Sequence, residues 1–270
     1  MADENVAQAP DTPDPEDERA LGKMSFLDHL GELRTRIVWS LVWAGGGLVI
    51  ALFFTERVMK YLVEHIIKVK PVFTTPTEAF WTYMKVAVIL GLFISMPAIL
   101  WQVWKFVSPG LHSHEKKYAA PFVLISSLLF VLGGAFAIFG VVPFAMQFLV
   151  NFGQQQGLQA MISISSSIDF ILKFTLAFGL VFEMPVIITI LSMIGLVTPQ
   201  FLSKNRKYAV LINFVIAAIL TPTPDIFNQS LMAAPMCLLY EVGIICARIF
   251  GRKRKPEAAP APASEETPAA

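Results

Sequence analysis

Charged residues are scarce along most of this 270-residue sequence, and their scarcity limits the classes of protein it can be. They make up 15% of the chain, whereas an ordinary soluble domain has about 25%. Between Tyr118 and Ile168, 51 consecutive residues include no Asp, Glu, Lys, Arg or His. Because a soluble fold needs a polar surface, this composition excludes an ordinary soluble enzyme and predicts several membrane-spanning segments.

Cysteine is also rare, and the motifs of common enzymes are missing. Cys237 and Cys246 lie nine residues apart in one apolar segment, so they face opposite sides of a helix and are interpreted as packing residues. The sequence has no metal-binding spacing of Cys or His, no G-x-x-x-x-G-K-[ST] phosphate loop, and no G-x-S-x-G or H-E-x-x-H motif. The histidines lie outside the apolar segments, at His29, His65, His112 and His114. We therefore expect no enzyme activity, no metal, no cofactor and no nucleic-acid partner.

Six apolar segments qualify as membrane spans, because a helix needs about 20 mostly apolar residues to cross about 30 Å of hydrocarbon. The segments are roughly 37–54, 82–106, 119–147, 169–195, 208–221 and 227–248. The fifth has 14 residues and reaches only about 21 Å at 1.5 Å per residue, so it would need a thinned bilayer. The sequence thus predicts an all-α polytopic membrane protein with six transmembrane helices.

The distribution of lysine and arginine predicts the orientation of these spans. If the termini and the second and fourth connections are cytoplasmic, they carry 15 of these basic residues, and the outer connections carry four. Basic residues gather on the cytoplasmic side of membrane proteins, so we expect both termini in the cytoplasm. The polar ends, 1–20 and 251–270, are typical of disordered tails that flank a membrane domain at 21–250. The acidic N-terminus lacks the features of a cleaved signal peptide.

Prolines and one carboxylate inside the predicted spans are unusual. Pro97, Pro185 and Pro235 lie well inside spans two, four and six, where each removes a helix hydrogen bond and bends the axis, which favours a curved, concave bundle. Glu183 lies near the centre of span four, where a charge costs about 2.5–3.5 kcal/mol on insertion scales. It is either a polar packing contact between helices of the bundle or a functional site for a polar partner or a hydrated cavity. Glu241, in span six, is interpreted as a paired charge near the inner interface.

Two carboxylates are predicted on the cytoplasmic face. The segment 25–36, SFLDHLGELRTR, is expected to be an amphipathic helix on the membrane surface, separate from span one. Its Glu32 could simply pair with Arg36, four residues later, or it could attract a cationic partner. Glu115, between spans two and three, is either a solvated charge or a second such site. Together they would suit a ligand with guanidinium groups, because arginine binds carboxylate through two parallel hydrogen bonds.

Four motifs together resemble one family, TatC, the multispanning subunit of the twin-arginine protein translocase. They are FLDHLGELRTR before span one, SMPAILWQVWKFVSPGL followed by HEKK, AFGLVFEMP in span four, and LTPTPDIFNQSLMAAPM between spans five and six. The similarity covers about residues 25–250. It implies a cup-shaped bundle of six helices with both termini in the cytoplasm, which agrees with the spans and the charge distribution.

The resemblance also implies roles for individual residues. In proteins that look like this, the carboxylates at the positions of Glu32 and Glu115 recognise the paired arginines of a signal peptide, and the carboxylate at Glu183 engages the transmembrane helix of TatA or TatB. Further matching positions are linked to structure or signal recognition (Arg34, Pro97 and Phe106) and to an outer-side motif for assembly and transport (Asp225 and Gln229). From the residues alone, Asp225 could instead only cap the helix that follows it.

The sequence therefore predicts a signal-peptide receptor in the bacterial cytoplasmic membrane. The resemblance implies that it is the core subunit of a homo-oligomeric TatBC-type complex, which exports folded proteins with TatA and TatB and uses the proton gradient. Membrane lipid is a further expected partner. An alternative is a secondary transporter of a small solute, with Glu183 as a proton-coupled site, although no repeat relates the two halves of the chain. An intramembrane hydrolase is excluded by the missing motifs.

Overall fold

The computed structural model describes residues 15–67, 71–108, 119–157, 161–221 and 225–250, with side chains from residue 29 onward. These residues are almost entirely helical, and one isolated β-bridge joins Val72 to Ser163. Two compact units divide the chain, Met1–Leu180 and Val181–Ala270, and we describe each by itself. The fold of the described residues is all-α, as the sequence predicts.

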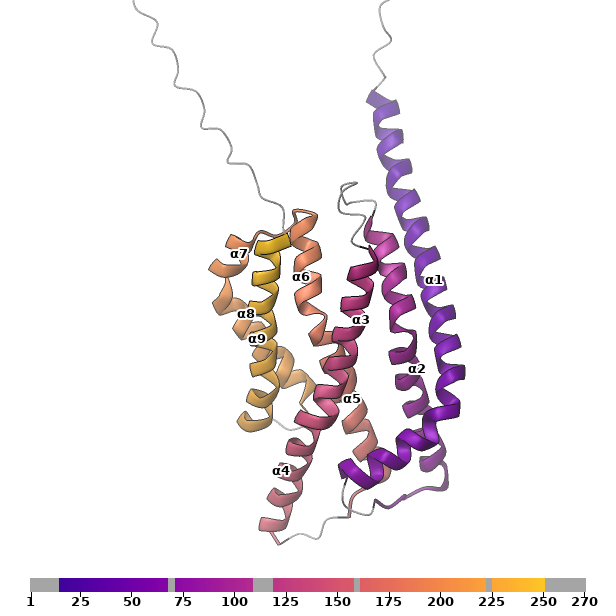
Figure 1. The fold of residues 1–270 in the computed structure, drawn as a ribbon, viewed down its shortest axis with the longest axis vertical. Coiled ribbons are helices and arrows are strands. Elements are labelled where there is room, and N and C mark those ends of the chain that lie inside the picture. Colours follow the sequence, from indigo (N-terminus) through magenta and orange to yellow (C-terminus); the bar gives the residue numbers. More distant parts are fainter. Residues whose placement is uncertain (1–14, 68–70, 109–118, 158–160, 222–224, 251–270) are drawn as a thin grey trace, which may run out of the picture. The chain divides into compact units, whose positions relative to one another are not determined.

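The first unit consists of long helices (Figure 1). They are α1 (Pro15–Tyr61), η1 (Leu62–Ile67), α2 (Pro76–Val107), α3 (Ala119–Phe136), η4 (Ala137–Val141), α4 (Val142–Gln155) and α5 (Ile164–Phe182), of which the last two residues of α5 belong to the second unit. The π-helical turn η4 joins α3 to α4 just before Pro143. Such turns accommodate an irregularity without ending the helix, so α3, η4 and α4 form one stretch.

Helix α1 differs from the prediction at its N-terminal end. It runs without a break from Pro15 to Tyr61, which includes the segment 25–36. That segment is therefore not a separate surface helix, and the prediction was wrong on this point.

Five of the described helical stretches are long and apolar enough to cross a membrane. They are His29–Ile67, Pro76–Val107, Ala119–Gln155, Ile164–Met193 and Ile226–Phe250. The fifth predicted span, 208–221, corresponds to α8 (Arg206–Leu220), whose 15 residues fall short of that length. The chain is thus an all-helical membrane protein with five candidate spans.

Glycine allows α1 and α2 to pack closely along their length. A Cβ atom on Gly91 would lie 2.7 Å from both the backbone N and the Cα of Leu48, which is closer than real atoms approach. Small residues at such crossings are a common basis of helix association in membranes. Farther along α2, Met96 and Leu100 pack with Phe130 of α3 in a buried cluster, so α2 lies between α1 and α3 (Figure 1).

The second unit holds four helices in its described part: α6 (Met184–Met193), α7 (Pro199–Lys204), α8 and α9 (Ile226–Phe250). Gly195, with a φ of 80°, follows the end of α6 in the left-handed conformation that glycine favours. Helix α6 packs on α9, where Ile188 and Ile244 belong to one buried cluster. Gly243 permits this approach, because a Cβ there would lie 2.7 Å from Cδ1 of Ile188.

Candidate functional site

Glu32 and Phe106 lie at the same end of the α1–α2 pair. The ring of His29 on α1 stacks on Phe106 of α2, with centroids 4.6 Å apart. One turn after His29, Glu32 Oε1 accepts a hydrogen bond of 3.0 Å from Arg36 Nη2. The two side chains are only 29% and 27% exposed. The pairing that sequence spacing suggested is therefore present, while Arg34 is exposed.

Of the other two residues of the predicted cytoplasmic site, Pro97 lies within the described part of the chain and Glu115 does not. Pro97 lies inside α2, where it has no N–H to donate to the carbonyl four residues earlier. Glu115 lies outside the described residues, so the structure says nothing of its distance from Glu32.

Glu183 is buried at a break between two helices. Its side chain is 5% exposed, and it occupies the position between the end of α5 and the start of α6. The amides of Val186 and Ile187 donate to its carbonyl at 3.0 and 2.9 Å. Pro185 explains the break, because a proline cannot donate to the carbonyl of Val181 and its ring crowds that carbonyl. A carboxylate is thus held at an irregular point within the candidate span Ile164–Met193.

Asp225 and Gln229 organise the start of α9. Asp225 Oδ1 accepts from the backbone N–H of Asn228 at 2.7 Å, and Oδ2 accepts from the Asn228 side chain at 3.0 Å. This is the capping geometry that the sequence suggested for Asp225. Gln229 Nε2 donates to the carbonyl of Phe214 at 3.0 Å, so Gln229 connects α9 to the middle of α8.

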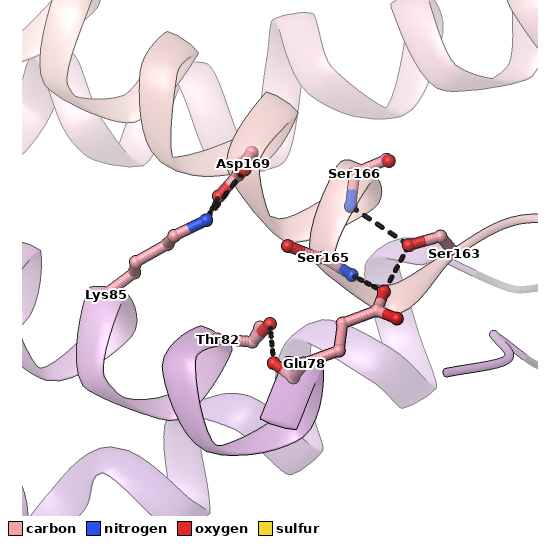
Figure 2. A network of polar contacts seen from close by, with 7 residues as sticks. All are labelled: Glu78, Thr82, Lys85, Ser163, Ser165, Ser166 and Asp169. Carbon is pink, nitrogen blue, oxygen red and sulfur yellow. Dashed lines mark hydrogen bonds and ion pairs between the residues drawn. The ribbon is translucent and has the colours of Figure 1, made fainter. Parts of the chain in front are cut away.

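A polar network joins the start of α2 to the start of α5, and the sequence analysis did not identify it (Figure 2). Glu78 accepts hydrogen bonds from the side chain of Ser163 and from the backbone N–H of Ser165, the latter at 3.1 Å. Lys85 lies two turns after Glu78 on α2, and Asp169 lies one turn after Ser165 on α5. The Nζ atom of Lys85 is 2.8 Å from both carboxylate oxygens of Asp169. We call this set the Glu78 network.

The Glu78 network continues into the backbone on both sides. Thr74 donates to Glu78 through its N–H at 2.6 Å and its hydroxyl at 2.7 Å. The β-bridge adds two bonds, from Val72 N–H to Ile162 at 3.0 Å and from Ile164 N–H to Val72 at 2.9 Å. The signal in the sequence was Thr75 three residues before Glu78, the spacing of a capping box. The partners of Glu78 at the start of α5, Ser163 and Ser165, lie more than 80 residues away in the sequence, so no local pattern could identify them.

Charged residues also connect the helices of the second unit. Glu241 of α9 binds Arg206 of α8, with Nη2 and Oε2 2.8 Å apart, so its predicted pairing is confirmed. Arg248 donates to Ser203 of α7 at 3.0 Å, and the Tyr240 hydroxyl donates to the carbonyl of Leu202 at 3.0 Å. The C-terminal part of α9 is thus fastened to α7 and to the start of α8.

Comparison with known proteins agrees with the fold and motifs. Residues 28–235 match the family described as Sec-independent protein translocase protein (TatC). The TatC protein of Desulforapulum autotrophicum is 42% identical over 237 residues, which are 86% of this chain and 87% of that protein. The TatC protein of Aquifex aeolicus is 40% identical and covers 86% of this chain and 98% of its own. A crystal structure of a twin-arginine translocase receptor, TatC, superimposes with a TM-score of 0.72 at 40% identity and covers 82% of this chain and 98% of that one.

Proposed function

The chain belongs to the TatC family of Sec-independent protein translocase proteins, and we propose how its residues carry out the function of that family. It is a multi-pass membrane protein, the core and signal-peptide receptor subunit of a twin-arginine translocase, and not an enzyme. Membership of this family replaces the alternative of a small-solute transporter.

We propose that Glu32 and Glu115 bind the paired arginines of the signal peptide at the cytoplasmic face. One observation carries the proposal: the partly exposed Glu32 carboxylate already holds a guanidinium group, that of Arg36, at 3.0 Å. An arginine of the peptide would use the same chemistry, because a carboxylate can accept from more than one N–H. Phe106 stacks on His29, one turn before Glu32, and we assign it to the same site together with Arg34 and Pro97.

The peptide site is tested by crosslinking a signal peptide to Glu32→Gln and Glu115→Gln variants in membranes. Each variant should lose binding by about tenfold or more, since hydrogen bonds to charged groups contribute about 1.5–3 kcal/mol. Glu64→Gln is the matched control, because Glu64 also lies four residues from a basic partner, Lys60, but in η1. A peptide with both arginines changed to lysine should bind the wild-type protein weakly. Unchanged crosslinking of both Glu variants would refute this site.

We also propose that Glu183 contacts the transmembrane helix of a single-span partner, TatA or TatB. Its position at the break between α5 and α6, inside a candidate span, supports this, because ionisable residues within membrane spans are rare and typically mark functional sites. Glu183→Gln should reduce recovery of these partners when the tagged protein is purified from membranes. Ser192→Ala, which changes another buried polar residue of the same region, should leave recovery unchanged. Equal recovery from both variants would contradict the assignment.

The arrangement in the membrane is the remaining part of the proposal. We propose six transmembrane helices in a cup-shaped bundle with both termini in the cytoplasm, and α8 as the short fifth crossing. The membrane domain is 21–250, with tails at 1–20 and 251–270. Asp225 and Gln229 form the outer-side motif for assembly, in a homo-oligomeric complex with TatA and TatB in the bacterial cytoplasmic membrane. Export of folded proteins draws on the proton gradient.

A further inference from the structure

A cavity of about 360 Å³ lies between α1 and α2, next to the end that holds Glu32 and Phe106. Its walls include Arg36, Trp39 and Trp43 from α1, and Trp101, Gln102 and Lys105 from α2. These positions recur every three or four residues, so one face of each helix lines the cavity. The lining residues lie beyond the close crossing of α1 and α2 near Gly47 and Gly91, and Ala98 is the first of them on α2.

Two buried polar atoms of this cavity have no hydrogen-bond partner among the described residues. Gln102 is 7% exposed, and its Oε1 accepts no hydrogen bond there. Arg36 donates to Glu32 through Nη2, but its Nε is buried and donates to no described atom. Buried polar groups are nearly always paired, because leaving one unpaired costs free energy. The cavity therefore presents one acceptor and one charged donor to a ligand.

The charge and the aromatic residues of the cavity indicate what that ligand is. Arg36 and Lys105 are both cationic, and the nearby acid, Glu32, is already paired with Arg36. Lys105 Nζ lies over the ring of Trp101, 5.7 Å from its centroid. Trp39 and Trp43 are about half exposed, and tryptophan gathers at the depth of lipid headgroups. Basic pockets between transmembrane helices typically bind anionic headgroups.

We propose that this cavity binds the headgroup of an anionic phospholipid that carries a hydroxyl group, the chemistry of phosphatidylglycerol. The phosphate oxygens accept from Arg36 Nε and Lys105 Nζ, and the headgroup hydroxyl donates to Gln102 Oε1. The exposed faces of Trp39 and Trp43 lie beside the acyl chains. Glu32 makes none of these contacts with the lipid, so this site is separate from the peptide-binding function proposed for Glu32.

The charge requirement is tested by native mass spectrometry of the full chain in detergent with added phosphatidylglycerol. Lys105→Gln should bind this lipid about fivefold more weakly, the contribution of one basic residue at a lipid surface. Lys207→Gln is the matched control, because Lys207 also lies over an aromatic ring, that of Tyr208, at 5.1 Å, but outside the cavity. It should bind as the wild type does. Equal loss in both variants, or no loss in Lys105→Gln, would overturn the proposal.

The hydroxyl requirement is tested with Gln102→Met, which keeps the size of the buried side chain but removes the acceptor. The wild type should prefer phosphatidylglycerol over phosphatidylmethanol, which has the same charge but no headgroup hydroxyl, by about fivefold, the contribution of one hydrogen bond. Gln102→Met should lose that preference while still binding both lipids. A preference that persists would overturn the assignment of Gln102.

Two further arms distinguish the lipid from other ligands. Inorganic phosphate at the lipid's concentration should not displace phosphatidylglycerol, and phosphatidylcholine should bind more weakly than phosphatidylglycerol. Displacement by phosphate would overturn the lipid assignment. If Lys105→Gln lost crosslinking to a twin-arginine peptide but kept full lipid occupancy, the cavity would belong to the peptide site and the proposal would be wrong. This last outcome leaves the test of Glu32 intact, so the two proposals fail independently.

Discussion

At the scale of single residues, two substitutions of Asp225 can separate its role as a helix cap from a role of its charge in transport. Asp225→Ala removes the cap on Asn228 and should destabilise the protein by about 1 kcal/mol. Asp225→Asn should cost much less, because asparagine caps as well as aspartate. The new amide group replaces Oδ2, which accepts from Asn228 Nδ2, so the Asn228 amide must turn over, and its Oδ1, which has no partner among the described atoms, then accepts from the new amide. Thermal unfolding of the purified variants measures both effects. If Asp225→Asn is as stable as the wild type but transports poorly, the carboxylate charge is needed for function; if it unfolds as early as Asp225→Ala, the capping account is wrong.

Local spacing explains which site residues could be predicted. The pairing of Glu32 with Arg36 follows from a separation of four residues on one helix, and the cap of Asp225 follows from its place before α9. Gln102 gave no signal, because its burial depends on Arg36 and three tryptophans from two helices meeting around it. The ion pair of Lys85 with Asp169 was missed for the same reason. Lys85 and Asp169 are 84 residues apart in the sequence and lie on different helices.

At the scale of helices, glycine positions determine where α1 can approach α2. Gly91→Ala should destabilise the protein by about 1–3 kcal/mol, the usual cost of overpacking, because the new Cβ would meet the backbone of Leu48 at 2.7 Å. Gly45→Ala is the matched control: a Cβ there would have no atom within 4 Å, and alanine in a helix is favoured over glycine by about 0.5–1 kcal/mol. Unfolding temperatures should therefore change in opposite directions. A similar change in both variants would show that the crossing is not tightly packed.

The helix boundaries show what apolar length does and does not determine. The predicted spans extend at most two residues beyond the ends of the observed helices, because a helix that crosses lipid must satisfy its own backbone hydrogen bonds. The predicted span 169–195 is interrupted at Glu183, where Pro185 removes a donor, yet its hydropathy gives no sign of a break. The stretch from Ala119 to Gln155 has 37 residues and is about 55 Å long at 1.5 Å per residue. The stretch is therefore longer than a bilayer is thick. We expect it to leave the lipid near its polar C-terminal end.

At the scale of the whole molecule, the number of crossings decides whether the two ends of the chain share one side. Helix α8 has 15 residues and is about 22 Å long, shorter than a usual span. Its contacts nevertheless follow α9 in the antiparallel direction: Arg206 binds Glu241, and the carbonyl of Phe214 binds Gln229, twelve residues earlier on α9. A helix that lay on the membrane surface could not follow α9 through this depth. The pairing supports α8 as a crossing, in which case the chain has an even number of spans.

Labelling with a membrane-impermeant maleimide in intact cells tests this topology, after Cys237 and Cys246 are replaced by alanine. With six spans, Gln200→Cys before α8 and Ser264→Cys in the C-terminal tail should both stay unlabelled until the membrane is opened, because both face the cytoplasm. Gln155→Cys, which is exposed at the end of α4, should be labelled at once and shows that the reagent reaches the outer side. If α8 does not cross, Gln200 and Ser264 fall on opposite sides and one of them reacts in intact cells. The five basic residues between Arg248 and Lys255 oppose that outcome, since basic segments next to a span are retained in the cytoplasm.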